Sequence, residues 1–276
     1  MADPILNDKT LEAARAGWAA PQAPSPGGQV WAPPGSPTGD GPVSTWKGAM
    51  TVRGTITATA VLFVLLLASA TAGWMAVKEK TGLDGQPQIQ FPSLAMVGVV
   101  VGIGIVFALM FKPQLAKFLA PVYAIAEGFA VGAISKAYES FQSGIVIQAV
   151  GATLGVFVVM LVLYRTGIIK VTEKFRRVVV FATLGVMAFY LVSFVLNIAG
   201  VDVEFFDKPN ALGIAFSIGV SVLAALNLAL RFDFIEKGVK MGLSKDFEWY
   251  AAFGLLVTIV WLYLELLRLL SKLQNR

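Results

Sequence analysis

The 276-residue chain is 57% hydrophobic and only 14% charged, and its mean hydropathy is +0.73. Soluble domains contain about 45–50% apolar and about 25% charged residues, so this composition excludes an ordinary soluble protein. The chain also lacks histidine and cysteine, which excludes disulfides, Cys/His zinc sites, thiol nucleophiles and an imidazole general base. The net charge of +5 is small and indicates membrane topology rather than nucleic-acid binding.

Residues 1–48 differ in composition from the rest of the chain. They hold eight of the 13 prolines, together with clustered glycine, serine and glutamine. Such a segment buries too little apolar surface to offset the entropy of ordering it. We predict a disordered cytoplasmic tail, which is either a solvated segment without a specific role or a docking segment for a partner. Residues 50–273 form the predicted membrane domain.

Seven long apolar runs follow the tail. A membrane-spanning helix needs about 20 predominantly apolar residues. Five of the runs carry no charge, and the third and the seventh carry one glutamate each. We therefore predict an all-α polytopic protein that spans the membrane seven times, at about residues 54–77, 91–111, 118–135, 140–164, 178–201, 209–230 and 249–267.

The distribution of lysine and arginine predicts the orientation of these spans. Fifteen of the 22 basic residues lie before the first run or in the connections after the second, fourth and sixth runs. Basic residues are enriched in cytoplasmic loops. The pattern places the N-terminus inside and the C-terminus outside, in a cell membrane (inner or plasma).

Several glycines within the spans are four residues apart. This spacing lets two helices approach each other closely. It predicts close helix packing at three pairs, which are Gly98 and Gly102, Gly128 and Gly132, and Gly151 and Gly155.

Three carboxylates lie in or beside the spans, where an ionisable side chain is costly and marks a functional site by default. Glu127 lies near the middle of the third span, Asp233 just past the sixth, and Glu265 towards the far end of the seventh. Each has a structural alternative. These are a protonated, hydrogen-bonded Glu127 and two interfacial ion pairs, of Asp233 with Arg231 or Lys237 and of Glu265 with Arg268.

Carboxylates suit both a cation pathway and a pH sensor. Their oxygens are hard ligands for Ca²⁺. Desolvation in an apolar setting raises the pKa of a carboxyl group, so a proton and a cation can compete for one site. Because histidine is absent, a buried carboxylate is the expected pH switch near neutrality. We expect no cofactor, and no metal beyond transient Ca²⁺ at these carboxylates.

Spans three to seven resemble the Bax inhibitor (transmembrane Bax inhibitor motif) family in its bacterial form. The resemblance rests on EGFAVG at residues 127–132, on Phe232-Asp233 at the end of the sixth span, and on LYLELLRLL at residues 262–270. It covers about residues 50–273 and leaves out the tail. It implies six helices around a central seventh helix. It also implies a pH-sensitive Ca²⁺ leak that two aspartates on helices six and seven gate.

Asp233 matches the first of these two aspartates. The second position falls on Thr258 in an ungapped alignment, which we favour, or on Glu265 when the Leu-Tyr-Leu-acid pattern is aligned. These two residues are seven apart and therefore share a helix face. Lys112 matches the basic residue at the end of the family's second helix. The residues expected to support the carboxylates are Lys112, Arg231, Glu236 and Arg268.

Two functions fit these observations. The first is a pH-modulated leak or transporter for Ca²⁺ or another cation, lined by the intramembrane carboxylates. The second is a non-conducting membrane regulator that binds a membrane protease, as the resemblance to some bacterial relatives implies, or another membrane-protein partner. The expected partners are the lipid bilayer, a cation and a membrane protein, without nucleic acid.

The residues argue against an enzyme. Serine hydrolases and zinc-dependent membrane hydrolases need histidine, which is absent. A retinal-binding protein needs a lysine within its last helix, and the nearest one, Lys272, lies beyond the seventh apolar run. We therefore expect a protein without catalytic residues.

Overall fold

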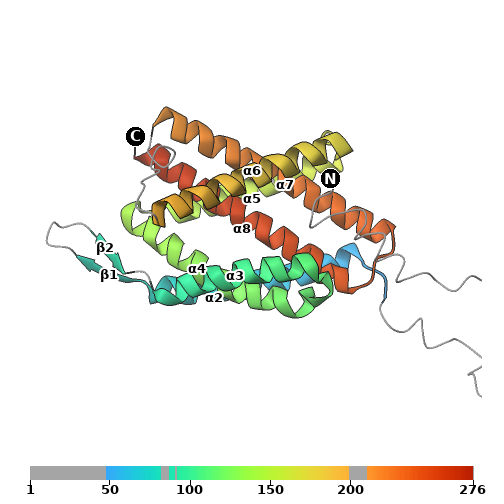
Figure 1. Ribbon diagram of the computed structural model, residues 1–276, viewed down its shortest axis with the longest axis horizontal. Helices are drawn as coiled ribbons and strands as arrows, with labels where there is room; N and C mark the ends of the chain where they lie inside the picture. The colour runs from blue at the N-terminus through green and yellow to red at the C-terminus, as the bar shows by residue number, and fades with distance from the viewer. Residues whose placement is uncertain (1–47, 82–86, 91, 199–209, 276) are drawn as a thin grey trace, which may run out of the picture.

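The computed structural model describes residues 48–81, 87–90, 92–198 and 210–275. Within these ranges the chain forms seven long helices, one β-hairpin and a short 3-10 turn (Figure 1). The helices are α2 (Val52–Ala76), α3 (Ser93–Phe111), α4 (Ala116–Phe141), α5 (Ile145–Arg165), α6 (Glu173–Ile198), α7 (Ala211–Lys240) and α8 (Asp246–Gln274). The hairpin consists of β1 (Lys78–Thr81) and β2 (Pro87–Gln90), and the turn is η1 (Pro113–Leu115).

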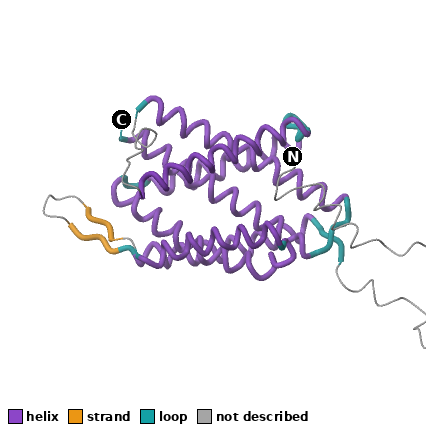
Figure 2. Tube along the Cα trace, in the orientation of Figure 1, coloured by secondary structure: helices purple, strands orange, loops and turns teal. Residues whose placement is uncertain are grey.

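All seven of these helices are long and apolar enough to cross a membrane. The predicted all-α, seven-span fold is therefore confirmed. The antiparallel hairpin, in which Lys78 pairs with Gln90, connects α2 to α3 beyond the end of the bundle (Figure 2).

Four helices extend several residues beyond the apolar runs that predict them. α4 continues to residue 141, α6 begins at residue 173, α7 continues to residue 240, and α8 continues to residue 274. Hydropathy marks the stretch in the bilayer core, whereas a helix can continue through the interface while its long basic side chains reach polar surroundings. Lys272 therefore lies inside the last helix, contrary to our prediction, and the argument against a retinal protein no longer holds on that ground. Its ammonium group donates a hydrogen bond to Oγ of Ser217 at 2.9 Å.

The helices form two layers with α8 between them. α2, α3 and α4 lie in one layer and α5, α6 and α7 in the other, while α8 crosses the bundle diagonally (Figure 1). α8 contacts α2, α4, α5 and α7. Buried side chains on α8, among them Phe253, Leu256, Leu262 and Leu267, supply much of the core. The seventh span is thus central, as the resemblance implies.

Glycines allow close contact within the layer of α2, α3 and α4. A Cβ atom added at Gly128 or Gly132 of α4 would overlap the backbone of α2, and one added at Gly98 of α3 would meet the backbone of α4. By contrast, Gly151 and Gly155 of α5 face open space. The prediction of close packing is therefore confirmed for the glycine pairs of α3 and α4 and is wrong for the pair in α5.

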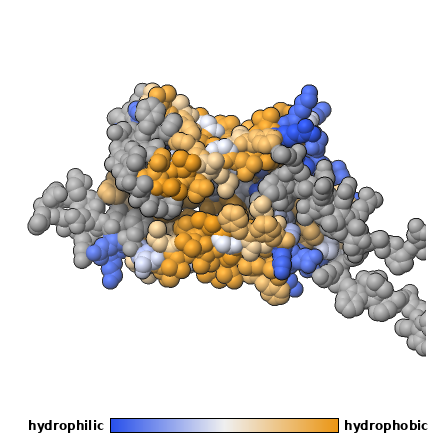
Figure 3. Space-filling view, in the orientation of Figure 1, coloured by the Kyte–Doolittle hydropathy of each residue, from blue (hydrophilic) through white to orange (hydrophobic). Residues whose placement is uncertain are grey.

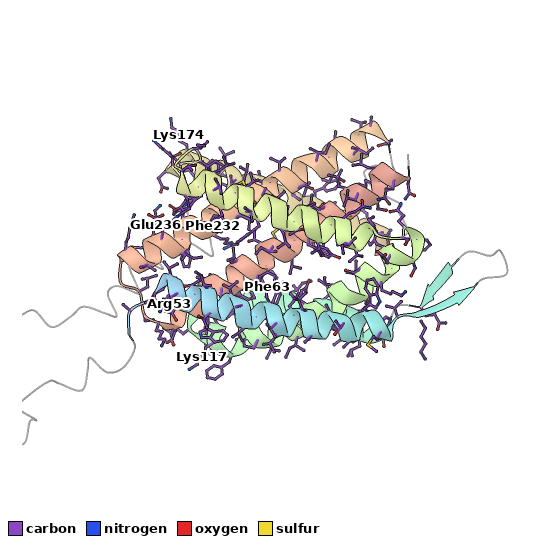
Figure 4. All side chains as sticks on the ribbon, turned by 180° about the vertical axis from the view of Figure 1, so that it is seen from behind. Arg53, Phe63, Lys117, Lys174, Phe232 and Glu236 are labelled. Atoms are coloured by element: carbon purple, nitrogen blue, oxygen red, sulfur yellow. The ribbon has the colours of Figure 1, made fainter. Side chains whose placement is uncertain are left out.

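The surface has the distribution expected of a membrane protein. Hydrophobic residues form a broad band across the middle of the face in Figure 3, and hydrophilic residues lie towards the ends. Arg53, Lys117 and Lys174 lie at one end of the bundle, together with Glu236 (Figure 4). We refer to this end, marked by Arg53, Lys117 and Lys174, as the basic end.

The residues just before α2 are attached to the turn between α7 and α8 at the basic end. Ala49 forms an isolated β-bridge with Ser244. The buried carboxylate of Glu248 accepts hydrogen bonds from the backbone N–H and the hydroxyl group of Thr51, both at 2.9 Å. The disorder predicted for residues 1–48 lies outside the described residues, apart from Gly48.

Candidate functional site

Asp233 lies in α7 near the basic end, where it pairs with two cations. Its Oδ2 atom is 3.0 Å from Nη2 of Arg176 in α6 and 2.8 Å from Nζ of Lys237, one turn further along α7. The Asp233 side chain is 11% exposed and that of Arg176 is 14% exposed. The expected pairing with Lys237 is therefore present, and Arg176 adds a link between two helices.

Arg231, the other expected partner of Asp233, joins α7 to α8. Its Nε donates a hydrogen bond to Oγ1 of Thr258 at 3.0 Å, and that hydroxyl donates to the carbonyl oxygen of Gly254 at 2.9 Å. A Cβ atom at Gly254 would lie 3.2 Å from Nη1 of Arg231, so glycine leaves room for the guanidinium group. Thr258 is 2% exposed. Through Arg231, this buried residue of α8 is hydrogen-bonded to the helical turn of α7 that carries Asp233.

A third contact joins the same end of α7 to α5. The phenol of Tyr164 donates a hydrogen bond to Oε2 of Glu236 at 2.6 Å, and Nζ of Lys240 lies 2.6 Å from Oε1 of the same residue. Polar residues of α7 thus bind α5, α6 and α8 within three helical turns. We name this group the α7 polar cluster: Arg231, Asp233, Glu236 and Lys237 with their partners Tyr164, Arg176 and Thr258.

Glu265 lies near the opposite end of α8, in a cluster of its own. It is 3% exposed. Its Oε1 accepts hydrogen bonds from the Tyr190 hydroxyl at 3.0 Å and from Trp261 Nε1 at 3.3 Å, and lies 3.2 Å from Arg268 Nη1. The Arg268 guanidinium also lies over the Tyr190 ring, 5.2 Å from its centroid. The interfacial ion pair with Arg268, which was the structural alternative for Glu265, is therefore present. Glu265 also contacts α6 through Tyr190.

Glu127 occupies a third position, between α3 and α4. A Cβ atom at Gly102 of α3 would lie 2.8 Å from Oε2 of Glu127 and 3.4 Å from the Tyr123 ring. Glu127 makes no hydrogen bond or ion pair with another described residue. Glu127 is therefore a half-buried carboxyl group that lies against Gly102. The structural alternative, a protonated Glu127 hydrogen-bonded to a polar neighbour, lacks that neighbour among the described residues.

The structure does not bring the three predicted carboxylates together. Asp233, Glu265 and Glu127 lie in three separate environments, and Lys112 is exposed at the end of α3. Within the described ranges no three acidic side chains are close enough to hold a metal ion. These described carboxylates therefore do not form a Ca²⁺ cage.

Sequence reasoning missed the partners that α5 and α6 supply. Arg176 belongs to the basic connection after the fourth span, which we interpreted only as a sign of orientation. Tyr164 and Tyr190 are single aromatic residues near helix ends, and interfacial tyrosines are common in any spanning helix. The available signal was a phenol or guanidinium group predicted to lie at the same depth in the membrane as a carboxylate. The sequence does not show which helix faces α7, so it could not identify the partners.

Comparison with known proteins supports the resemblance. A family model described as Bax inhibitor 1 like matches residues 3–275. The match begins at residue 3, so it includes the proline-rich segment that the resemblance left out. No curated protein matches the chain significantly. The seven-span chain therefore belongs to the Bax inhibitor 1 like family of membrane proteins.

Proposed function

We propose that this multi-pass membrane protein is a pH-modulated leak or transporter for Ca²⁺ or another cation, and that it carries no enzymatic activity. The observation that carries the proposal is the ion pair between Asp233 of α7 and Arg176 of α6, at 3.0 Å. The pair depends on the charge of one carboxylate. It joins two helices, so its loss would change how they pack.

α6 is the helix that such a loss would release. Only 6% of its most hydrophobic stretch is buried, against 56% for α8. Its polar links to the bundle include Arg176–Asp233, Thr183–Asn227 and Tyr190–Glu265. Lipid is as apolar as the helix surface, so polar links and close packing account for helix association in a bilayer. Breaking one of these links frees the end of α6 at the basic end.

The sign of the pH effect follows from this link. The charged carboxylate lies between Arg176 and Lys237. Removing its negative charge leaves two cations close together, which repel each other, and a carboxylate loses its charge when it binds a proton. The leak therefore increases as the pH falls. With the N-terminus inside, the basic end faces the cytoplasm of a cell (inner or plasma) membrane, and the cytoplasmic pH is the one sensed.

Flux through liposomes tests this function. The purified full chain is reconstituted with a Ca²⁺ dye inside the vesicles, and flux is measured over a series of pH values. Asp233→Asn removes the charge permanently, so we expect high flux that does not depend on pH. Glu173→Gln, an exposed carboxylate near the start of α6, is the matched control and should behave as wild type. Wild-type pH dependence in the Asp233→Asn protein would disprove the gating role.

The second function is a non-conducting regulator that binds a membrane protease or another membrane protein. It is favoured by the bridge between Ala49 and Ser244, because Gly48, the first described residue, also accepts a hydrogen bond from the backbone N–H of Lys245 in the α7–α8 turn. Zero flux in liposomes from wild type and Asp233→Asn alike would favour this function. Deleting residues 1–47 should leave the flux of a leak unchanged but should abolish tail-dependent regulation.

A further inference from the structure

A large apolar cavity lies between the two layers, away from the α7 polar cluster. Its volume is about 710 Å³. Its walls come from α2 and α5, with α4 and α8 behind, and they include Phe63, Leu67, Val131, Val150 and Leu154. Figure 4 shows α2 and α5 on the near side of the bundle, with Phe63 on the side of α2 that faces α5.

The hydroxyl groups on the cavity wall are already hydrogen-bonded within the protein. The hydroxyl groups of Thr71 and Thr153 donate to backbone carbonyls of their own helices, at 2.7 Å in each case. Ser135 and Tyr263 share a hydrogen bond of 2.7 Å. An ordered water needs about two to four polar partners, so this cavity offers water little. An apolar chain suits it better, and its volume lies within the range of about 300–1,000 Å³ typical of ligand pockets.

The position of the cavity determines which apolar chain can reach it. α2 and α5 expose large hydrophobic side chains beside it, among them Leu67 and Leu154, which are both 59% exposed. In a bilayer such surfaces contact lipid tails. An acyl chain can therefore enter sideways, without crossing a polar layer.

A cation lies where the cavity approaches the end of α2. Trp74, close to the last residue of α2, lines the cavity, and Nζ of Lys136 lies 5.4 Å from the centroid of a Trp74 ring. Tryptophan is enriched at the level of the lipid headgroups. An ammonium group at that level attracts the anionic headgroup of a lipid whose chain lies in the cavity.

We propose that this cavity binds an anionic phospholipid, with one acyl chain between α2 and α5 and its phosphate beside Lys136. The site shares no residue with the α7 polar cluster. Lipid binding and cation flux can therefore be tested, and can fail, independently of each other.

Native mass spectrometry of the full chain in detergent measures bound lipid directly. Phosphatidylglycerol and phosphatidylcholine are titrated separately. Val150→Trp and Leu154→Trp each fill the cavity from α5, while Val158→Trp places the same side chain on an exposed position of α5 outside it. We expect the two cavity variants to lose at least half of the bound phosphatidylglycerol and the control to retain it. Equal occupancy in all three folded variants would show that the cavity does not hold the chain.

Lys136→Gln tests the headgroup contact. A lysine near the membrane surface contributes about 1 kcal/mol to the binding of anionic lipid, which is about fivefold in affinity. We expect the preference for phosphatidylglycerol over phosphatidylcholine to fall about fivefold. Lys117→Gln, an exposed lysine at the other end of α4, should leave the preference unchanged. The same preference in both variants would disprove the role of Lys136.

Discussion

Arg176 of α6 donates a hydrogen bond to Oδ2 of Asp233 in α7 at 3.0 Å, and so ties the least buried of the described spans to the bundle. Lys237 shares the same carboxylate oxygen from within α7. One of the two cations therefore acts between helices and the other within one helix. The two can be separated by mutation.

Arg176→Gln removes the interhelical cation and leaves Asp233 paired with Lys237. A hydrogen bond to a charged group contributes about 1.5–3 kcal/mol, so its loss should shift the equilibrium between closed and open forms by about tenfold or more. We expect a higher leak at neutral pH and a weaker dependence on pH in the liposome assay. The exposed neighbour Arg177 provides the control variant Arg177→Gln, which should match wild type. Similar flux from both variants would contradict the role of the pair.

Glu265→Gln probes the second carboxylate cluster. Glu265 accepts from Tyr190 and Trp261 and pairs with Arg268, so it holds the other end of α6. Neutralising it leaves the Arg268 guanidinium without its buried counter-charge, which should cost about 1–3 kcal/mol. We expect a lower midpoint of thermal unfolding in detergent, and a leak whose pH dependence is unchanged. Loss of the pH dependence in this variant would show that Glu265, and not Asp233, is the pH sensor.

Gly132→Ala tests the contact between α2 and α4. The added methyl group would overlap the backbone of α2 at Ala70, and overpacking of this kind costs about 1–3 kcal/mol. Gly155→Ala in α5 meets open space and should instead gain about 0.5–1 kcal/mol, because alanine favours helix over glycine. Thermal unfolding of the two variants should therefore shift in opposite directions. A shift of Gly132→Ala to higher temperature would show that the two helices can separate without cost.

The spans themselves could be predicted from the sequence because an apolar run of bilayer length is a local property. The central position of α8 came from the resemblance to the family, not from the hydropathy of its residues. Helix ends were less predictable: α7 continues through Asp233 and Glu236 to residue 240, because hydropathy reports the surroundings of a helix and not its backbone hydrogen bonds.

The contacts of the candidate site depend on which helices face each other, and one sequence does not encode that locally. Gly128 and Gly151 occupy similar four-residue patterns, yet the first contacts α2 and the second faces open space. Asp233 was identified from its position, whereas its partner Arg176 required the packing of α6 against α7. The choice between Thr258 and Glu265 was likewise a matter of depth along α8. Thr258 contacts Arg231, and Glu265 contacts Tyr190.

Thr258→Asp tests whether a stronger acceptor on Thr258 strengthens the contact between α7 and α8. Nε of Arg231 lies 3.0 Å from the Thr258 hydroxyl, and a carboxylate of similar size there would form an ion pair with the guanidinium. We expect the α7–α8 contact to tighten, flux at neutral pH to fall, and flux to rise more steeply as the pH falls, because two carboxylates must then be protonated. Thr258→Val keeps the shape but removes the acceptor, so its flux at neutral pH should rise. Liposome flux that changes in the same direction in both variants would show that the acceptor on Thr258 does not control the closed form.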